Sequence, residues 1–271
     1  MSAPGTVEDW ARAFVQTTEL REKCAPGEPP AAWSPSPRVE RLPGPGRPPE
    51  LRVVAKSSRS LRRPELADPR KRARLLHSLW HHELQAAELF AWAILAFADA
   101  PHEFRTGLLR LCTDELRHAR AYARRVVELG SAIGEHAVRD WFWERAMGCT
   151  TATMFVAFLG LGLEGGNLDH AQRLAADFVA VGDVESAAVL AMVERDEIEH
   201  LRFGVTWFAR FTGGLDFDRW RRELVAPLTP SMMRGKVLNR SARSHAGLDR
   251  DFLDALENFR APTPNAGQDY S

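Results

Sequence analysis

Hydrophobic residues recur every three or four positions along most of the chain after residue 67, a spacing that keeps them on one face of an α-helix. Four long segments share this pattern, at residues 68–99, 102–129, 150–180 and 184–212. The segments within each half are separated by short turns, marked by Pro101 and by Gly182. A short turn makes consecutive helices antiparallel, so the pattern predicts two antiparallel helix pairs.

The two pairs are linked by a longer connection, in which the aromatic stretch EHAVRDWFWERAM (135–147) predicts a short helix. Long crossover connections of this kind occur in four-helix bundles. We therefore expect an all-α fold, a four-helix bundle with a crossover helix. Trp141, Phe142 and Trp143 are interpreted as an aromatic cap on the bundle.

The ends of the chain differ in composition from its middle. Residues 6–24 predict one helix, whereas residues 25–65 are rich in proline and glycine and predict an extended strap, because proline lacks the backbone donor that a helix needs. Short helices are expected near 216–226 and 247–259. The predicted organisation is an N-terminal helix and strap (1–65), the bundle (66–213) and a C-terminal helical extension (214–271).

The composition of the chain argues against several classes of function. The 36 basic and 36 acidic residues give no net charge, so no overall field attracts nucleic acid. The basic stretch at 52–74 is interpreted as a solvated arm. The longest apolar run, MFVAFLGLGL (154–163), is shorter than the roughly 20 residues of a membrane span. Three cysteines without a C-x-x-C pair, and an N-terminus unlike a signal peptide, lead us to expect a cytoplasmic protein with free thiols.

Two helices of different pairs carry the same chemical motif. TDELRH (113–118) and RDEIEH (195–200) both contain Asp-Glu-x-x-His. With this composition even one copy of the pattern is uncommon by chance, and two copies are rare. Glu and His at positions i and i+3 lie on one helix face, where they can offer an oxygen and a nitrogen to a metal ion. Two such helices, each paired with a helix that supplies one more glutamate, form the di-metal site of ferritin-like bundles.

The repeat also indicates which glutamates the partner helices supply. Glu83 precedes Glu115 by 32 residues, and Glu164 precedes Glu197 by 33. Glu88 competes with Glu83, but the two point about 140° apart around the helix, so both cannot face the metals. The predicted ligands are oxygen-rich with two imidazoles, which suits iron or manganese; they are Glu83, Glu115, His118, Glu164, Glu197 and His200.

These motifs resemble the ferritin-like di-iron superfamily. The run ELQAAELF (83–90) is similar to the start of ferritin and rubrerythrin first helices. The fuller pattern resembles the DUF455 family, related in kind to the tRNA-hydroxylating MiaE-like proteins; its segments are PGRP (45–48), HHELQAAEL (81–89), DELRHARAY (114–122) and LNRSARSHAG (238–247).

The resemblance implies roles for residues beside the ligands. In di-iron proteins of this type the aspartate before the ligand glutamate accepts a hydrogen bond from the histidine on the other ligand helix, so we expect the pairs Asp114–His200 and Asp196–His118. Surface salt bridges are the alternative. Tyr122 follows His118 at a spacing similar to that of the radical tyrosine in the ribonucleotide reductase small subunit; a redox role and a hydrogen bond near the site both stay open.

The glycines near Glu164, Cys112 and the remaining histidines give less specific indications. The glycines around Glu164 (Gly160, Gly162, Gly165 and Gly166) indicate either a bulge with a void beside the metals or close helix packing. Cys112 is expected to be a core thiol. The histidines outside the two motifs lack matching partners and are interpreted as surface or core residues; they are His77, His81, His82, His102, His136, His170 and His245.

The expected function is that of a non-heme carboxylate-bridged di-iron oxygenase or oxidase, which uses O2 as co-substrate to hydroxylate or oxidise an organic substrate. The cofactor is expected to be two iron ions, with Mn/Fe and Mn/Mn as alternatives. Expected partners are the small or medium-sized substrate and an external electron donor such as a ferredoxin or a reductase, with no membrane; a homodimer stays open. The alternatives are an iron-handling ferroxidase or peroxide scavenger and, less favoured, a tRNA-modifying hydroxylase that contacts nucleic acid through the basic stretch.

Overall fold

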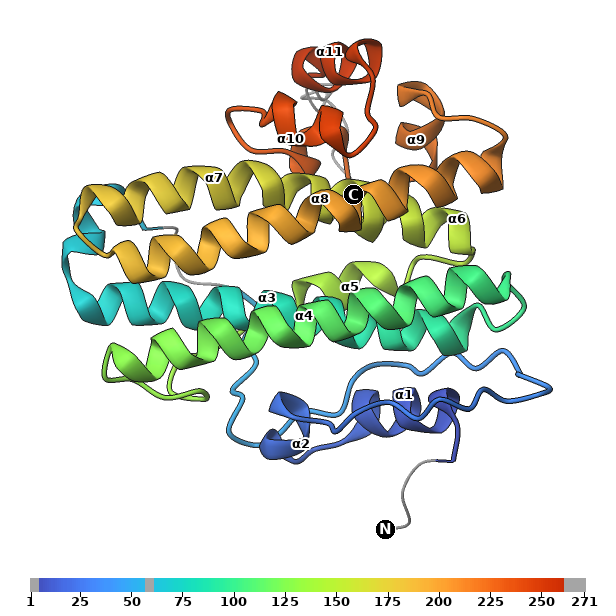
Figure 1. Cartoon of the computed structure of the whole chain (residues 1–271), viewed down its shortest axis with the longest axis horizontal. Helices are drawn as coiled ribbons and strands as arrows, with labels where there is room; N and C mark the ends of the chain where they lie inside the picture. Colours follow the sequence, from blue (N-terminus) through green and yellow to red (C-terminus); the bar gives the residue numbers. More distant parts are fainter. Residues whose placement is uncertain (1–4, 57–60, 261–271) are drawn as a thin grey trace, which may run out of the picture.

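The computed structural model describes residues 5–56 and 61–260 (Figure 1). As predicted, this part of the chain is all-α, and within it the only β-type pairing is a single bridge between Val53 and Val138. Four long helices form the centre, α3 packing along α4, α7 along α8, and α4 against α8. These helices are α3 (Pro69–Ala96), α4 (His102–Glu128), α7 (Glu164–Ala180) and α8 (Val184–Thr212).

The ends of the long helices follow local sequence signals. The side chain of Asp68 accepts a hydrogen bond from the backbone N–H of Arg70 and caps α3, whose first residue is Pro69. Asp183 caps α8 in the same way through Ser186. Gly213 ends α8 in the left-handed conformation, with φ 76°, which favours glycine. The four predicted segments therefore match the long helices to within a few residues, except at the start of the third.

The third segment differs from the continuous helix predicted for residues 150–180. It begins as α6 (Ala152–Phe155), continues as the π-helix η2 (Val156–Leu163) and becomes α-helical again at Glu164. Gly160 of η2 faces Gly204 of α8 so closely that a Cβ on Gly204 would lie 2.6 Å from the carbonyl of Gly160. Gly160 thus serves close helix packing, and the wider π turn that directly precedes Glu164 corresponds to the expected bulge.

The N-terminal residues form two helices and not one, α1 (Val7–Gln16) and α2 (Leu20–Cys24). The predicted single helix is wrong because other groups satisfy the last carbonyls of α1. The backbone N–H of Gly46 in the strap and the ammonium group of Lys23 both donate to the carbonyl of Val15. The break lets α2 fold back, and this layer packs on α3 and α4 (Figure 1).

The crossover helix α5 (Trp141–Ala146) is shorter than predicted. Residues 135–140 are not helical, since Val138 exchanges backbone hydrogen bonds with the strap, accepting from Val54 and donating to Arg52. Three cysteines, Cys24, Cys112 and Cys149, are free, as expected.

The C-terminal extension lies on the opposite side of the four helices from α1 and α2 (Figure 1). Two of its helices were predicted, and the short elements η3 and α10 between them were not. Arg243 of α10 is buried and pairs with Asp169 of α7 at 2.9 Å, which anchors the extension. The elements are α9 (Phe217–Glu223), η3 (Pro230–Met233), α10 (Arg240–His245) and α11 (Arg250–Asn258).

The basic stretch at 52–74 is partly neutralised by the bundle. Arg63, in the short helix η1 (Arg63–Ala67), pairs with Asp177, and Arg72 pairs with Asp183. Arg59 lies outside the described residues. Among the helices of the described part, none is long and apolar enough to cross a membrane.

Candidate metal centre

The four long helices bring all six predicted ligands together in the interior. The potential ligand atoms form two groups, and within each group all the atoms lie within 4.8 Å of one another. All six side chains are buried. Two members, Glu115 and Glu197, belong to both groups. One group consists of Glu83, Glu115, His118 and Glu197, and the other of Glu115, Glu164, Glu197 and His200. The shared glutamates lie between two potential ion positions, and Glu83 and Glu164 each belong to one.

Both imidazoles direct the same nitrogen to the carboxylates. Nδ1 of His200 lies 2.9 Å from Oε1 of Glu115 and 3.2 Å from Oε2 of Glu197. Nδ1 of His118 lies 3.5 Å from oxygens of both Glu83 and Glu115. The two motifs therefore present equivalent atoms from α4 and α8.

The opposite nitrogens face the two aspartates. Nε2 of His118 lies 3.1 Å from Oδ2 of Asp196, and Nε2 of His200 lies 3.6 Å from Oδ2 of Asp114. Each aspartate lies on the other ligand helix, as in the crossed arrangement expected from the sequence. Arg117 pairs with both carboxylates, at 2.8 and 2.9 Å, and ties them together at the surface. For His118 the acceptor at Nε2 holds the proton there and leaves Nδ1 free for a ligand, whereas Nε2 of His200, 3.6 Å from Asp114, has no hydrogen-bond partner among the described residues.

Several buried atoms of the cluster have no hydrogen-bond partner of normal geometry. They include both carboxylate oxygens of Glu115, one oxygen each of Glu164 and Glu197, and Nδ1 of His118 and of His200. Buried polar atoms in proteins almost always have a partner, so this concentration of unpaired acceptors requires an explanation. Oxygen and imidazole nitrogen are suitable ligands for iron or manganese. The residues present therefore fit two metal ions.

The electrostatics of the cluster lead to the same conclusion. Burial, and then the negative charge of Glu115, raise the pKa of Glu83 well above its ordinary value. Burial followed by the charges of Glu197 and Glu115 raises the pKa of Glu164 in the same way. Burial opposes the charged form of His118, but the nearby carboxylates of Glu115 and Glu83 outweigh it and raise the pKa of His118 to about 11. Without metal the cluster retains protons, and two divalent cations can replace them.

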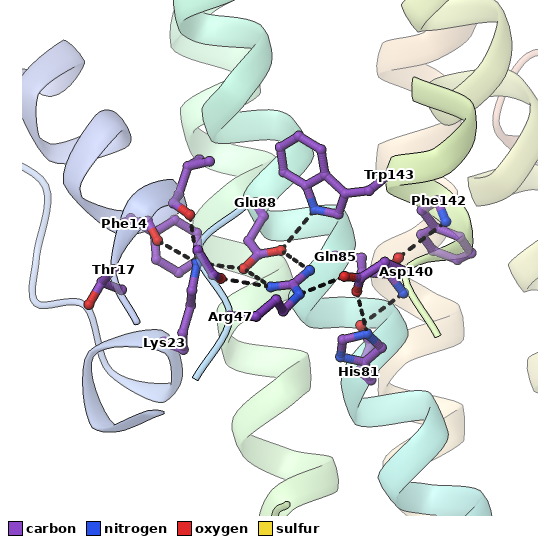
Figure 2. Close-up of polar contacts among 12 residues, drawn as sticks. Phe14, Thr17, Lys23, Arg47, His81, Gln85, Glu88, Asp140, Phe142 and Trp143 are labelled. Carbon is purple, nitrogen blue, oxygen red and sulfur yellow. Dashed lines mark hydrogen bonds and ion pairs between the residues drawn. The ribbon is translucent and has the colours of Figure 1, made fainter. Parts of the chain in front are cut away.

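Glu88, the competitor of Glu83, belongs to a different buried network (Figure 2). Its carboxylate accepts hydrogen bonds from Arg47 at 2.7 and 2.8 Å and from Trp143 at 2.9 Å, and pairs with the ammonium group of Lys23 at 2.7 Å. Burial disfavours its ionised form, but Arg47 and Lys23 lower the pKa of Glu88 below its ordinary value. The structure thus places Glu83, and not Glu88, in the carboxylate–histidine cluster.

Sequence reasoning did not anticipate this network. Arg47 also reaches Asp140 at 2.8 Å, and Asp140 lies 3.0 Å from Nε2 of His81 (Figure 2). His81 is a buried residue, one of the two possibilities expected from the sequence, and it has a specific partner in Asp140. Trp143 is a buried donor to Glu88, so the three aromatic residues of α5 are not simply a cap. The sequence contained one indication of this network, Arg47 in the PGRP segment. Its partners Glu88 and Asp140 lie 41 and 93 residues further along the chain, so the sequence alone does not identify them.

Tyr122 is buried beside the cluster. Burial raises its pKa well above the ordinary value, and the charges of Glu83, Glu197 and Glu115 raise it further, so the phenol stays protonated. Cys112 is a buried thiol on the same helix whose pKa burial also raises. The position equivalent to Tyr122 in the second motif is Gly204, where the contact with Gly160 leaves no room for a side chain. A redox role for Tyr122 stays a prediction.

A cavity of about 330 Å³ lies over one face of the cluster, between α3 and α7. Glu83, Glu115 and Glu164 border it at the metal site. Its other lining residues are mostly apolar, and they include Phe142 of α5 and Met232 of η3. The remaining apolar ones are Leu79, Ala86, Leu159, Leu163 and Leu174. The crossover helix and the C-terminal extension thus contribute walls to a space that reaches the metal site.

The fold and the site define an all-helical protein with a buried carboxylate–histidine cluster that could bind metal ions. The chain belongs to the family described as "Protein of unknown function (DUF455)", whose model matches residues 6–254. It is similar to an "Uncharacterized protein" of Haemophilus influenzae, with 28% identity over 193 residues that cover 67% of this chain and 66% of that protein. The family expected from the sequence is thereby confirmed. No solved structure shows a significant match to the chain.

Proposed function

We propose that this protein is a ferritin-like di-iron oxygenase or oxidase that uses O2 to oxidise a small organic substrate. The observation that carries the proposal is the pair of overlapping Glu/His groups, joined by Glu115 and Glu197, beneath a largely apolar cavity. Two antiparallel helix pairs that each supply one Glu and one Glu-x-x-His are the arrangement of ferritin-like di-iron and di-manganese proteins.

The charge of the cluster matches two divalent cations, because four glutamates carry four negative charges when ionised. Glu83 and His118 would bind one ion, Glu164 and His200 the other, and Glu115 and Glu197 would bridge them. When bound, a ferrous pair supplies electrons for the reduction of O2. Hydroxylation of a C–H bond places one oxygen atom in the product and the other in water, and it consumes two electrons and two protons. An external donor such as a ferredoxin or a reductase would supply the electrons, and solvent would supply the protons.

The protein side chains would prepare this chemistry in three ways. Asp196 keeps the proton of His118 on Nε2, so that Nδ1 faces the cluster, and Asp114 places a negative charge 3.6 Å from Nε2 of His200. The apolar lining of the cavity keeps water from the reacting centre. Tyr122 keeps a protonated phenol close to the carboxylates, where it can donate a hydrogen atom or a hydrogen bond.

The two alternative functions receive less support. An iron-handling protein needs an acidic path for cations, but the carboxylates that line this cavity are those of Glu83, Glu115 and Glu164 at its floor. A tRNA-modifying enzyme needs a strongly basic surface, and the charges of Arg63 and Arg72 in the basic stretch are partly neutralised by aspartates of the bundle.

The proposal is tested by metal content and by the response to oxygen. Wild-type protein purified without oxygen is expected to bind two iron or manganese ions per chain and to change its optical spectrum when O2 is admitted. Glu197→Ala removes a shared ligand and is expected to lose both properties. Glu199→Ala is the matched control, because Glu199 lies two residues away on the same helix with 66% of its side chain exposed.

A folded wild-type protein that binds neither iron nor manganese would contradict the proposal. So would equal metal binding by the Glu197→Ala and Glu199→Ala variants. Circular dichroism of each variant shows whether a loss of metal reflects a loss of fold.

A further inference from the structure

The cavity over the metal site has a floor, walls and a mouth of different chemistry. The floor consists of glutamates of the cluster, and the walls are apolar. The mouth is formed by exposed side chains from three elements, His82 of α3, His170 and Arg173 of α7, and Met232 of η3. A ligand that enters therefore passes polar and cationic groups before it reaches apolar surface.

One side of the mouth is a flat aromatic surface. The rings of His82 and Phe142 are stacked, with centroids 5.1 Å apart and planes inclined by 28°. Stacking fixes the orientation of two side chains that would otherwise move independently. This edge suits the passage of an apolar chain or ring.

The other side of the mouth carries a positive charge. Nη1 of Arg173 donates to one oxygen of Asp177 at 2.8 Å, and Nε of Arg63 donates to the other at 2.6 Å. Two guanidinium groups thus share one carboxylate, so the group has a net charge of about plus one. The side chains of Arg173 and Arg63 are 53% and 62% exposed, so their remaining N–H donors are available to a ligand.

Asp177 offsets only one of the two guanidinium charges. Among the residues that line the cavity, the carboxylates are confined to the floor. Four ionised glutamates with two divalent cations have no net charge, so the loaded floor does not repel an anion. A cationic mouth repels ferrous ions and attracts anions.

We propose that the cavity binds an organic acid, with its apolar part directed toward Glu83 and Glu164 and its carboxylate held at the mouth by Arg173. That this acid is the substrate rests on the proposed function. The binding itself depends only on the cavity and on its charged rim. The volume is at the lower end of the roughly 300–1,000 Å³ typical of small-molecule sites, which restricts the ligand to a small acid.

The test compares two ligands of the same shape that differ in charge, octanoate and octanamide. Their binding to the full-length protein is measured by calorimetry, with metal content determined on the same samples. Arg173→Gln is expected to weaken octanoate binding about three- to tenfold, as for an exposed charge-assisted contact, and to leave octanamide binding unchanged. Arg124→Gln on α4 is the control, since Arg124 is exposed and does not line the cavity.

Failure of octanoate to bind, or equal binding of octanoate and octanamide by the wild-type protein, would overturn the inference. So would an equal effect of Arg173→Gln on both ligands. The result separates this inference from the proposed function. If the protein selects octanoate through Arg173 but binds no iron, the acid site is supported and the di-iron proposal is contradicted. If it binds two irons but does not select octanoate, the di-iron proposal is supported and the acid site is contradicted.

Discussion

Nε2 of His118 on α4 lies 3.1 Å from Oδ2 of Asp196 on α8, so α8 helps to orient an imidazole of the carboxylate–histidine cluster that α4 supplies. Acceptors in this position set the tautomer and basicity of a ligand histidine. Asp196→Asn keeps the shape of the side chain but removes its charge. We expect the affinity for the first metal ion to fall about 10- to 100-fold, measured by anaerobic titration against a competing chelator.

Glu199→Gln, an exposed change on the same helix, is the control for that titration. Asp114→Asn should have a smaller effect, because Asp114 lies 3.6 Å from His200. Unchanged affinity in the Asp196→Asn variant would show that the aspartate is only a surface partner of Arg117.

Glu83 and Glu88 lie five residues apart on α3 and are expected to differ in function. Glu88→Gln leaves the buried ammonium group of Lys23 without its counter-charge and removes one of the two carboxylates that pair with Arg47, so we expect the free energy of unfolding to fall by about 3–5 kcal/mol. Glu83→Gln should abolish metal binding at one position without this loss of stability. Urea denaturation of the metal-free variants and metal analysis of the folded ones measure the two effects.

The opposite result would assign metal binding to Glu88 and the stabilising role to Glu83. If Glu88→Gln lost metal while Glu83→Gln retained two ions per chain, the assignment of Glu83 to the centre would be wrong.

The stability of the metal-free protein should depend on pH because the cluster retains protons. Burial and neighbouring carboxylates raise the pKa of Glu83 and of Glu164 above the ordinary 4.5. The stability contributed by these protons is fully present below pH 4.5 and is lost as the pH rises through the raised values. His118, with its pKa raised from 6.5 to about 11, adds an effect of the same sign at higher pH.

We therefore expect the free energy of unfolding of the metal-free protein to decrease between pH 6 and pH 9, measured by urea denaturation. Glu83→Gln combined with Glu164→Gln should flatten this decrease. Metal-loaded protein should lack most of it, because the ions replace the protons. An identical pH profile for the metal-free wild type and the double variant would refute the explanation.

Gly204 allows α8 to approach η2. A Cβ added there would lie 2.6 Å from backbone atoms of Gly160, which cannot move aside as a flexible side chain can. Gly204→Ala should therefore destabilise the protein by about 1–3 kcal/mol, despite the higher helix propensity of alanine. Gly166→Ala is a matched control, since its nearest new contact is at 3.4 Å. Thermal unfolding of both variants tests the difference, and equal stability would argue against the close approach.

Several parts of the fold could be predicted from the sequence because their signals are local. The long helices follow from apolar periodicity, and their ends follow from caps such as Asp68 and Asp183. The two Glu-x-x-His motifs needed only the geometry of one helix turn. Shorter elements were predicted less well, because backbone contacts with distant segments ended α1 at Gln16 and kept residues 135–140 from becoming helical.

The sequence by itself determined the all-helical class, the family and the six candidate ligands, since helix spacing and repetition along the chain are sufficient for each. Only the tertiary structure decided that Glu88 belongs to a network with Lys23 and Arg47, because those partners are separated from it by tens of residues. It also decided the π-helix before Glu164 and the cavity with Arg173 at its mouth. A cavity is the space left when several elements pack together, so no single segment of the sequence encodes it.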